Sequence, residues 1–138
     1  MIDLKLTNDG ELVVAENGDL EIVFGDEQIA QEVLFRLKTT PGDWVLSPKI
    51  GVDLEKFIGQ ANVKTTHLLM ETAISRALTY DNLLIQPSVE AIATGENEVF
   101  ILIEFDSVEE NNRVIQIQSG LDLKKGLVFA KLGSRMLQ

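Results

Sequence analysis

The chain lacks cysteine altogether and contains one histidine among its 138 residues. Without cysteine it forms neither disulfides nor thiolate metal sites, and it has no thiolate nucleophile. This absence fits synthesis in a reducing cytoplasm. The single histidine, His67, has no partner histidine at helical spacing and no metal motif nearby. Packing at the edge of a helix is therefore favoured over chemistry for this residue.

Long hydrophobic runs are also missing. No apolar stretch approaches the roughly 18 residues that would suggest a membrane span. Residues 1–5 do not have the basic start followed by an apolar core that marks a cleaved leader. We therefore expect no membrane partner and no secretion by a cleaved signal.

Basic residues are scarce, with 12 Lys and Arg against 22 Asp and Glu, for a net charge of −10. Such a surface repels a phosphate backbone, so we predict no nucleic-acid partner. The charge is uneven, because residues 121–138 carry a net +3 and leave −13 for residues 1–120. A basic tail on an acidic body indicates docking, either on the body itself or on an acidic neighbour.

The common catalytic motifs are absent as well. We find no G-x-S-x-G, no H-E-x-x-H and no phosphate-binding glycine loop. Several acidic residues lie at predicted turns and helix starts, where capping accounts for them. They are Asp19, Asp26, Glu27, Asp43 and Asp53. We predict no catalytic, cofactor-binding or metal-binding residue, and no enzyme activity.

Residues 18–59 carry the strongest local pattern. A strand over residues 20–24 stops at Gly25, and Asp26 is suited to cap a helix that runs to about Lys38. That helix has one apolar stripe at helical spacing, which predicts a buried face. The stripe consists of Ile29, Ala30, Val33, Leu34 and Leu37.

A turn rich in proline and glycine follows this helix and contains the only tryptophan. Two prolines and two glycines within about a dozen residues predict a fixed shape against the body. Trp44 is either a hydrophobic plug in this connection or part of a contact surface, since tryptophan buries a large area in both cases. A short helix over residues 54–58, capped by Asp53, comes next.

The sequence also predicts a hairpin at the N-terminus and a second long helix. Asn17-Gly18 predicts an N-terminal hairpin, because both positions tolerate positive φ, and residues 8–10 predict a turn before it. A second long helix runs from about residue 62 to Tyr80 and has its own core-facing stripe. This stripe consists of Met70, Ala73, Ile74, Ala77 and Leu78.

Three extended segments follow, at residues 89–94, 98–106 and 113–119. A short turn joins the first two, which predicts an antiparallel hairpin. Residues 99–103 are apolar at every position, which is typical of a central strand covered on each side. The acidic segment 107–112 is predicted to be a solvated connection.

The strand at residues 113–119 alternates isoleucine with glutamine, which indicates one wet face. In the last segment, Leu127, Phe129 and Lys131 are predicted to lie on one side of a strand and residues 128, 130 and 132 on the other. This segment is either one more strand of the same sheet or an arm that joins a neighbour's sheet. The first is favoured, because an unpaired apolar edge invites aggregation.

Together these segments predict an α+β fold in a single domain. An N-terminal β-hairpin, two main helices and a short helix pack on a mostly antiparallel sheet of about three to four strands. We divide the chain into the hairpin at residues 1–25, the core at residues 26–120 and the basic C-terminal segment at residues 121–138, which is the candidate arm.

Several short motifs occur in a fixed order along residues 12–93. They are Gly18-Asp19-Leu20, Gly25-Asp26-Glu27, Gln31 within the helix, TTPGD at residues 39–43 and PKIGVDL at residues 48–54. In this order the chain resembles the phage baseplate wedge or sheath-initiator family, called gene-25-like or tail protein W-like, with relatives in type VI secretion baseplates. The chain departs from the family's E-P-R motif at Gln86-Pro87-Ser88, where only the proline remains, so no charged bidentate pair is available there.

The resemblance implies a structural protein of the virion, located in the tail baseplate and assembled in the cytoplasm of the bacterial host. About six copies around the tail axis would join other baseplate wedge proteins, contact the tail tube and initiate the tail sheath. Sheath arms would add as strands to an exposed edge at residues 113–119 or 127–132. Deleting residues 121–138 would then leave a folded monomer that no longer nucleates sheath.

The resemblance and the edge pattern together give the candidate partner-binding residues. Those for wedge neighbours are Trp44, Pro48, Gln86, Pro87 and Ser88. Those at the candidate edges are Arg113, Gln116, Gln118, Leu127, Phe129 and Lys131.

Two other functions remain as hypotheses. The family is sometimes labelled lysozyme-like, so the alternative is a peptidoglycan-cleaving glycosidase, which needs two carboxyls about 5 to 10 Å apart with one kept protonated. No Glu here has an Asp nine positions later, the spacing expected of phage-type lysozymes. The third hypothesis is a small binding module from an unrelated system.

Overall fold

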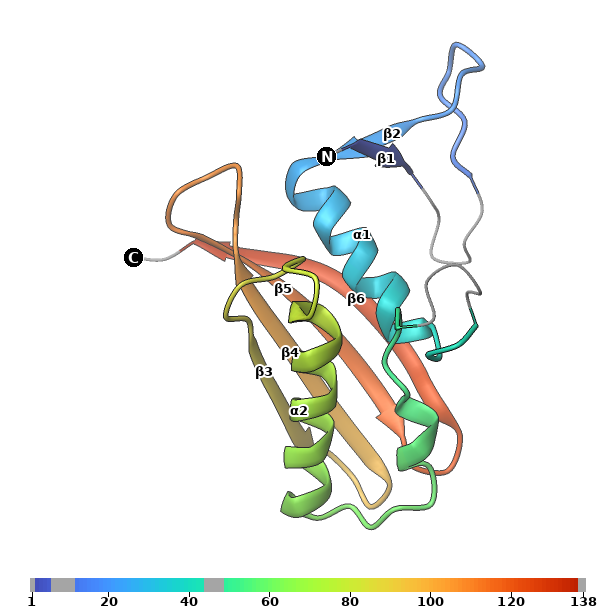
Figure 1. Ribbon diagram of the computed structural model, residues 1–138, viewed down its shortest axis with the longest axis vertical. Helices are drawn as coiled ribbons and strands as arrows, with labels where there is room; N and C mark the ends of the chain where they lie inside the picture. The colour runs from blue at the N-terminus through green and yellow to red at the C-terminus, as the bar shows by residue number, and fades with distance from the viewer. Residues whose placement is uncertain (1, 6–11, 44–48, 137–138) are drawn as a thin grey trace.

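The computed structural model describes residues 2–5, 12–43 and 49–136 (Figure 1). The predicted turn at residues 8–10 and the residues Trp44 and Pro48 lie outside this part of the chain. The described elements are β1 (Ile2–Leu4), β2 (Ile22–Phe24), α1 (Gly25–Lys38), the 3-10 helix η1 (Leu54–Phe57), α2 (Lys64–Thr79), β3 (Ser88–Ala93), β4 (Glu98–Asp106), β5 (Arg113–Asp122) and β6 (Gly126–Met136). The predicted α+β fold in one domain is confirmed. None of the described helices is long and apolar enough to cross a membrane.

The four long strands form an antiparallel sheet in the order β3-β4-β5-β6, and both α-helices lie on the same face of it (Figure 1). The predicted hairpin of β3 and β4 is confirmed. Burial alternates along β4, with Val99, Ile101 and Ile103 buried against the helices and Phe100 and Leu102 only half-buried. The expectation that both faces of β4 are covered is therefore wrong, because both helices pack on one side.

The core lies between this sheet and the two predicted helical stripes. From α1, Ala30, Val33 and Leu37 are buried, while Ile29 and Leu34 are partly buried against them. From α2, the buried residues of the stripe are Met70, Ile74, Ala77 and Leu78, with Ala73 partly buried. The helical period of the apolar residues thus correctly selected the buried face of each helix.

The N-terminal hairpin is present in the described residues. Val14 bridges Leu20 in antiparallel fashion around Asn17-Gly18, and Gly18 has a φ of +89°. β1 pairs with β2 as a separate two-stranded sheet.

His67 is buried, and its Nε2 lies 2.5 Å from Asn62 Oδ1. The predicted packing role of this histidine is therefore confirmed.

The start of α1 differs from the prediction. Phe24, not Asp26, is the N-cap residue, and it makes no side-chain cap bond. The Asp26 carboxylate instead accepts hydrogen bonds from Ser107 Oγ at 2.5 Å and from the Val108 N–H at 2.8 Å. Glu109 Oε1 in turn accepts from the Asp26 N–H at 3.3 Å. The segment 107–112 is therefore not merely a solvated connection, because it supplies the carboxylate at the N-terminus of α1.

The predicted short helix is the 3-10 turn η1, and Asp53 makes no side-chain cap bond there.

An ion pair between buried Arg36 and partly exposed Asp81 holds the two long helices together. Arg36 of α1 is 3% exposed and binds Asp81, just after α2, through both terminal nitrogens, at 2.9 Å and 2.6 Å. Its Nη1 also donates to the Ala77 carbonyl at 2.8 Å. This network sets the α1–α2 contact against which η1 packs.

Candidate functional site

Strand β6 forms one edge of the main sheet. It pairs with β5 along its length, and no other strand of the described chain lies on its far side. The expectation that residues 113–119 form an edge is wrong, because β5 pairs with β4 on one side and with β6 on the other. Of the two predicted candidates, the terminal strand is the one with a free side.

The backbone groups that face the open side of β6 follow from the hydrogen-bond pattern. At the two ends of the β4–β5 ladder, the Leu123 N–H donates to the Asn97 carbonyl and the Ser107 N–H donates to the Arg113 carbonyl. Because bonding alternates along antiparallel strands, odd-numbered residues of β5 bond to β4 and even-numbered ones bond to β6. In β6 the backbone groups of residues 129, 131 and 133 therefore point inward, and those of residues 130, 132 and 134 point to the open edge.

A β-bulge changes the two faces of β6. Gly120 of β5 lies opposite Phe129, but the next residue, Leu121, lies opposite Leu127, so Val128 is an extra residue. This insertion shifts the alternation by one position. Leu127 therefore lies on the helix side, partly buried against the core, whereas Phe129 and Lys131 lie on the open face. The prediction that Leu127 shares a face with Phe129 and Lys131 is wrong for this reason.

Phe129 lies over Gly120 on the open face of the sheet. A Cβ atom added at Gly120 would be 2.3 Å from a carbon of the Phe129 ring, so the ring occupies the space that a side chain would need. The Lys131 ammonium is 5.9 Å from the centre of the same ring. Glycine at this position thus allows an aromatic side chain to cross β5 next to the bulge.

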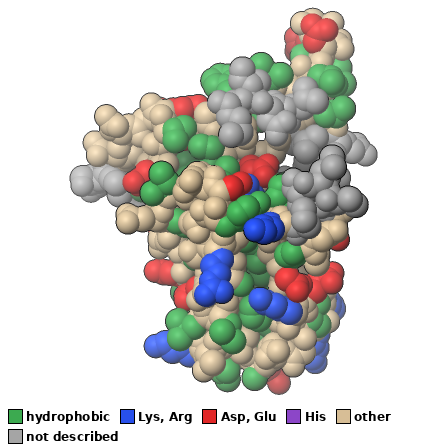
Figure 2. Space-filling model, in the orientation of Figure 1, with side chains coloured by type: hydrophobic (Ala, Val, Ile, Leu, Met, Phe, Trp, Pro, Cys, Tyr) green, Lys and Arg blue, Asp and Glu red, His purple; other side chains and the backbone are tan. Residues whose placement is uncertain are grey.

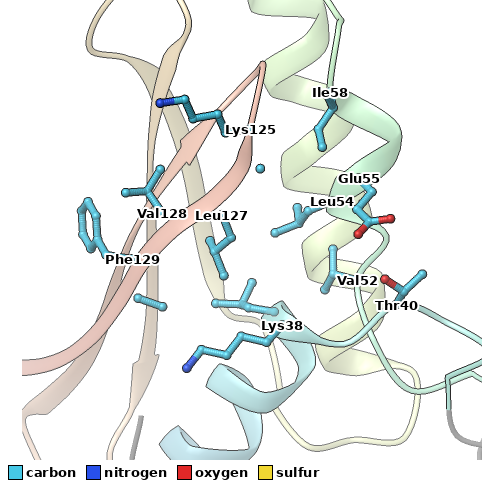
Figure 3. A pocket seen from close by; sticks show the side chains of 13 residues that line it. Lys38, Thr40, Val52, Leu54, Glu55, Ile58, Lys125, Leu127, Val128 and Phe129 are labelled. Atoms are coloured by element: carbon cyan, nitrogen blue, oxygen red, sulfur yellow. The ribbon is translucent and has the colours of Figure 1, made fainter. Parts of the chain in front are cut away.

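A groove runs between β6 and the segment that leads from α1 to η1 (Figure 3). Its volume is about 580 Å³. Leu127 of β6 and Leu54 of η1 face one another across it, with Lys38 and Glu55 at its rim (Figure 3). Val128, which is 66% exposed, stands at the β6 side. The open edge therefore has a groove of mixed apolar and polar lining beside it on the helix side.

The other edge of the sheet, β3, is covered in part by α2. By the same alternation the Ala91 N–H points outward, and it donates to Glu71 Oε1 of α2 at 3.3 Å. Ala91 itself is buried beneath α2. The two edges are therefore unequal, since α2 supplies an acceptor to β3 while the described chain supplies none to Ala130 or Leu132 of β6.

The structure does not bring the predicted contact residues together. Gln86, which has a φ of +52°, and Pro87 precede β3 at the covered edge. Ser88 lies in the same row as Gln116, which pairs with Gly133 of β6. With about 4.8 Å between neighbouring strands, Ser88 is about 14 Å from β6. The two sets of residues belong to different surfaces.

The glutamines and the arginine of β5 lie close to β6 but face neighbours within the same chain. Gln116 Nε2 donates to Glu104 Oε2 at 3.1 Å, and Gln118 lies opposite Lys131. Arg113 Nε is 3.4 Å from Glu110 Oε2. No local pattern predicts Glu71 at the β3 edge or the bulge at Val128, because both depend on pairing between distant segments.

Comparison with known protein families decides the class of the chain. A family model described as contractile injection system sheath initiator matches residues 2–94. The chain belongs to this family. Sheath initiators are structural proteins, so the family indicates a sheath-initiating role in a phage tail or baseplate and association with other tail or sheath components.

One solved structure similar to this sheath initiator is a candidate tail lysozyme from Geobacter sulfurreducens. The two share 20% identity at a TM-score of 0.51, over 92% of this chain and 96% of the other. This similarity shows a common fold and carries no activity over. No curated protein matches the chain.

Metal binding and glycoside cleavage make different demands on acidic side chains. No group of histidine, aspartate and glutamate side chains within the described ranges is arranged to hold a metal ion. Hydrogen bonds from Arg36 hold the pKa of Asp81 below its usual value, so this carboxyl stays ionised. A general acid for glycoside cleavage needs the opposite shift.

Proposed function

We propose that the protein is a baseplate component that joins wedge proteins around the tail tube and starts the sheath by accepting a strand on the edge of β6. The observation that carries this proposal is the row of outward backbone groups at residues 130, 132 and 134, with a groove of mixed lining beside Ala130. At the opposite edge of the same sheet Glu71 accepts from one outward N–H, that of Ala91, so that edge is the less open of the two.

Strand addition supplies both affinity and specificity at such an edge. The backbone of an incoming segment pairs with the outward N–H and carbonyl groups of β6, and its side chains alternate between the two faces. On the helix side they meet the groove between Leu54 and Leu127, and on the open face they meet Phe129 and Lys131. We therefore expect a sheath arm with apolar residues at every second position.

The β6 edge lies outside residues 2–94, the part that matches the family model. The proposal for β6 thus depends on sheet topology, while the sheath-initiating role depends on the family. β6, at residues 126–136 of the basic C-terminal segment, is here the strand that receives the arm. In this proposal the C-terminal segment is a receiving edge and not an arm.

The contacts with wedge neighbours belong to the other side of the molecule in this proposal. The turn at Gln86-Pro87-Ser88 lies at the β3 edge, away from β6, and is available for a second partner. Trp44 and Pro48 remain candidate contacts for the same neighbours. Copies around the tail axis, about six by the symmetry of such assemblies, would then leave each β6 edge free for sheath.

Two proline substitutions test the edge. Ala130→Pro removes an outward N–H and leaves the β5–β6 ladder intact, so the protein should fold while sheath assembly fails. Lys131→Pro removes an inward N–H that bonds to β5, and should destabilise the fold by about 1 to 3 kcal/mol. Sheath rings on tails that carry each variant are counted by electron microscopy, and folding is measured by urea unfolding. Normal sheath on a folded Ala130→Pro protein would remove the β6 edge from the proposal.

Deleting residues 121–138, the experiment suggested by the sequence, does not test this point. Leu121 and Leu123 are both 2% exposed and belong to the core, and the deletion also exposes the whole paired side of β5. The expectation that a folded monomer remains is therefore replaced by the expectation of an unfolded or aggregated chain. A single substitution at the edge is the sharper experiment.

A further inference from the structure

A second groove lies between α2 and the segment around η1, on another part of the surface from the β6 edge. Its volume is about 800 Å³, and its lining is more apolar than polar. The residues that matter for the argument are Leu69, Ala73, Arg76 and Tyr80 from α2 and its end, and Lys56 and Phe57 from η1. Neither the sheath-initiating role nor strand addition at β6 uses this groove.

The α2 side of the groove is a second stripe on that helix. Leu69, Ala73, Arg76 and Tyr80 recur at i, i+4, i+7 and i+11, so they lie in one row beside the buried core stripe. Leu69 is 58% exposed and Tyr80 is 48% exposed. Ala73 is partly buried against the core and Arg76 is charged, so the row exposes apolar surface at Leu69 and Tyr80 with a cation between them, which suits a partner.

The charge around this groove is opposite to that of the whole chain. Lys49, Lys56 and Arg76 line it, and Asp53 is the one acidic residue among the described lining residues. None of these three cations forms an ion pair with an acidic residue in the described part of the chain. Figure 2 shows Lys and Arg side chains gathered over α2 and the neighbouring η1 segment. A basic groove on a chain of net charge −10 selects an acidic occupant.

One wall of the groove is held in place by the fold. The Arg36 guanidinium lies 5.4 Å from the centre of the Tyr80 ring and is itself fixed by Asp81 and by the Ala77 carbonyl. On the other wall, the Lys56 ammonium lies 5.2 Å from the centre of the Phe57 ring. Binding against fixed aromatic walls avoids the cost of ordering them.

We propose that this groove binds an amphipathic helix of another tail component, with a leucine stripe flanked by acidic residues. A helix fits because the groove runs alongside α2 and presents apolar contacts in a helical row, the arrangement of helix-in-groove recognition. A second copy of this chain is disfavoured, since two chains of net charge −10 repel each other. The inference adds a partner to the protein and does not depend on strand addition at β6.

A pair of labelled peptides tests the proposal on the full-length protein. The first is a helical peptide with a leucine stripe flanked by glutamates, and the second carries lysines in place of the glutamates. Fluorescence anisotropy should show binding of the acidic peptide alone, and this binding should weaken as salt is added. Lys56→Glu/Arg76→Glu should weaken it about tenfold and allow the lysine peptide to bind.

The matched control is Lys64→Glu/Lys124→Glu, which changes the net charge equally at residues outside the groove lining. This variant should bind the acidic peptide as the unaltered protein does. Leu69→Ser should lose binding while keeping the fold, because Leu69 is exposed. Ala130→Pro, which alters the β6 edge, should bind normally, so failure at one surface is separated from failure at the other.

Three results would overturn the proposal. One is the absence of binding by the acidic peptide, and another is equal weakening in the groove variant and in the control variant. The third is concentration-dependent dimerisation in sedimentation experiments that Lys56→Glu/Arg76→Glu abolishes, because the groove would then bind a second copy.

Discussion

At the scale of single residues, Arg36 is the side chain whose surroundings matter most for the fold. It is buried between the two long helices and depends on Asp81 for its counter-charge. Asp81→Asn leaves the guanidinium facing an amide, and we expect the free energy of unfolding to fall by about 1 to 2 kcal/mol. This loss in the free energy of unfolding is small for a charged pair, because Asp81 is 39% exposed and water screens the pair. Urea unfolding measures the loss, with Glu96→Gln in an exposed turn as the control.

The same pair predicts how stability depends on pH. Hydrogen bonds from Arg36 hold the pKa of Asp81 below its ordinary value of 3.8, so the folded state binds this proton less readily than the unfolded state. The stabilisation is complete above that ordinary value and is lost as the pH falls through the lower pKa of the folded protein. Asp81→Asn should therefore match the unaltered protein at strongly acid pH and be less stable near neutrality. A difference that is constant with pH would contradict this account.

At the scale of elements, the N-terminus of α1 depends on a loop far away in the sequence. Glu109 Oε1 accepts from the Asp26 N–H, and the close approach leaves no room for a Cβ atom at Gly25. Glu109→Ala removes negative charge from the positive end of the helix, and we expect a loss of about 1 kcal/mol in the free energy of unfolding. Glu110→Ala, which breaks only a partly exposed pair with Arg113, should cost less. Equal losses in the two variants would show that the carboxylate does not cap α1.

The local elements could be predicted from the sequence because their signals are local. The helical spacing of the apolar residues in α1 and α2 predicted which face of each helix is buried. The alternation of Ile115, Gln116 and Ile117 predicted the two faces of β5. Asp26 was expected to accept hydrogen bonds from the free N–H groups of α1, but its carboxylate makes no cap bond there. Its partner was wrong, because Val108 lies 82 positions away along the chain.

The candidate site could be predicted only in part, since it depends on which strands are neighbours. Nothing local in the sequence distinguishes β5, which is paired on both sides, from β6, which is paired on one. The bulge at Val128 exists only relative to Gly120 and Leu121 of the adjacent strand. The faces of Leu127 and Phe129 were therefore assigned by simple alternation, which a single extra residue reverses.

At the scale of the whole molecule, the surfaces have separate uses. The sheet has one covered edge and one open edge, and the basic groove beside α2 lies apart from both. A protein that connects several neighbours needs such separate surfaces, since one partner must not block another. The arrangement fits membership of the sheath initiator family better than it fits a single substrate cleft.

The glycosidase hypothesis gives a last prediction at this scale. Cleavage of a glycosidic bond needs two carboxyls about 5 to 10 Å apart, one of them protonated. The carboxylates that the fold brings together, Asp26 and Glu109, are both held in structural contacts, since Asp26 accepts from the Val108 N–H and Glu109 accepts from the Asp26 N–H. We therefore expect purified protein to release no muropeptides from peptidoglycan, under conditions in which an added phage lysozyme releases them. Release that a single Asp26→Asn or Glu109→Gln substitution abolishes would contradict this expectation and assign these carboxyls a chemical role.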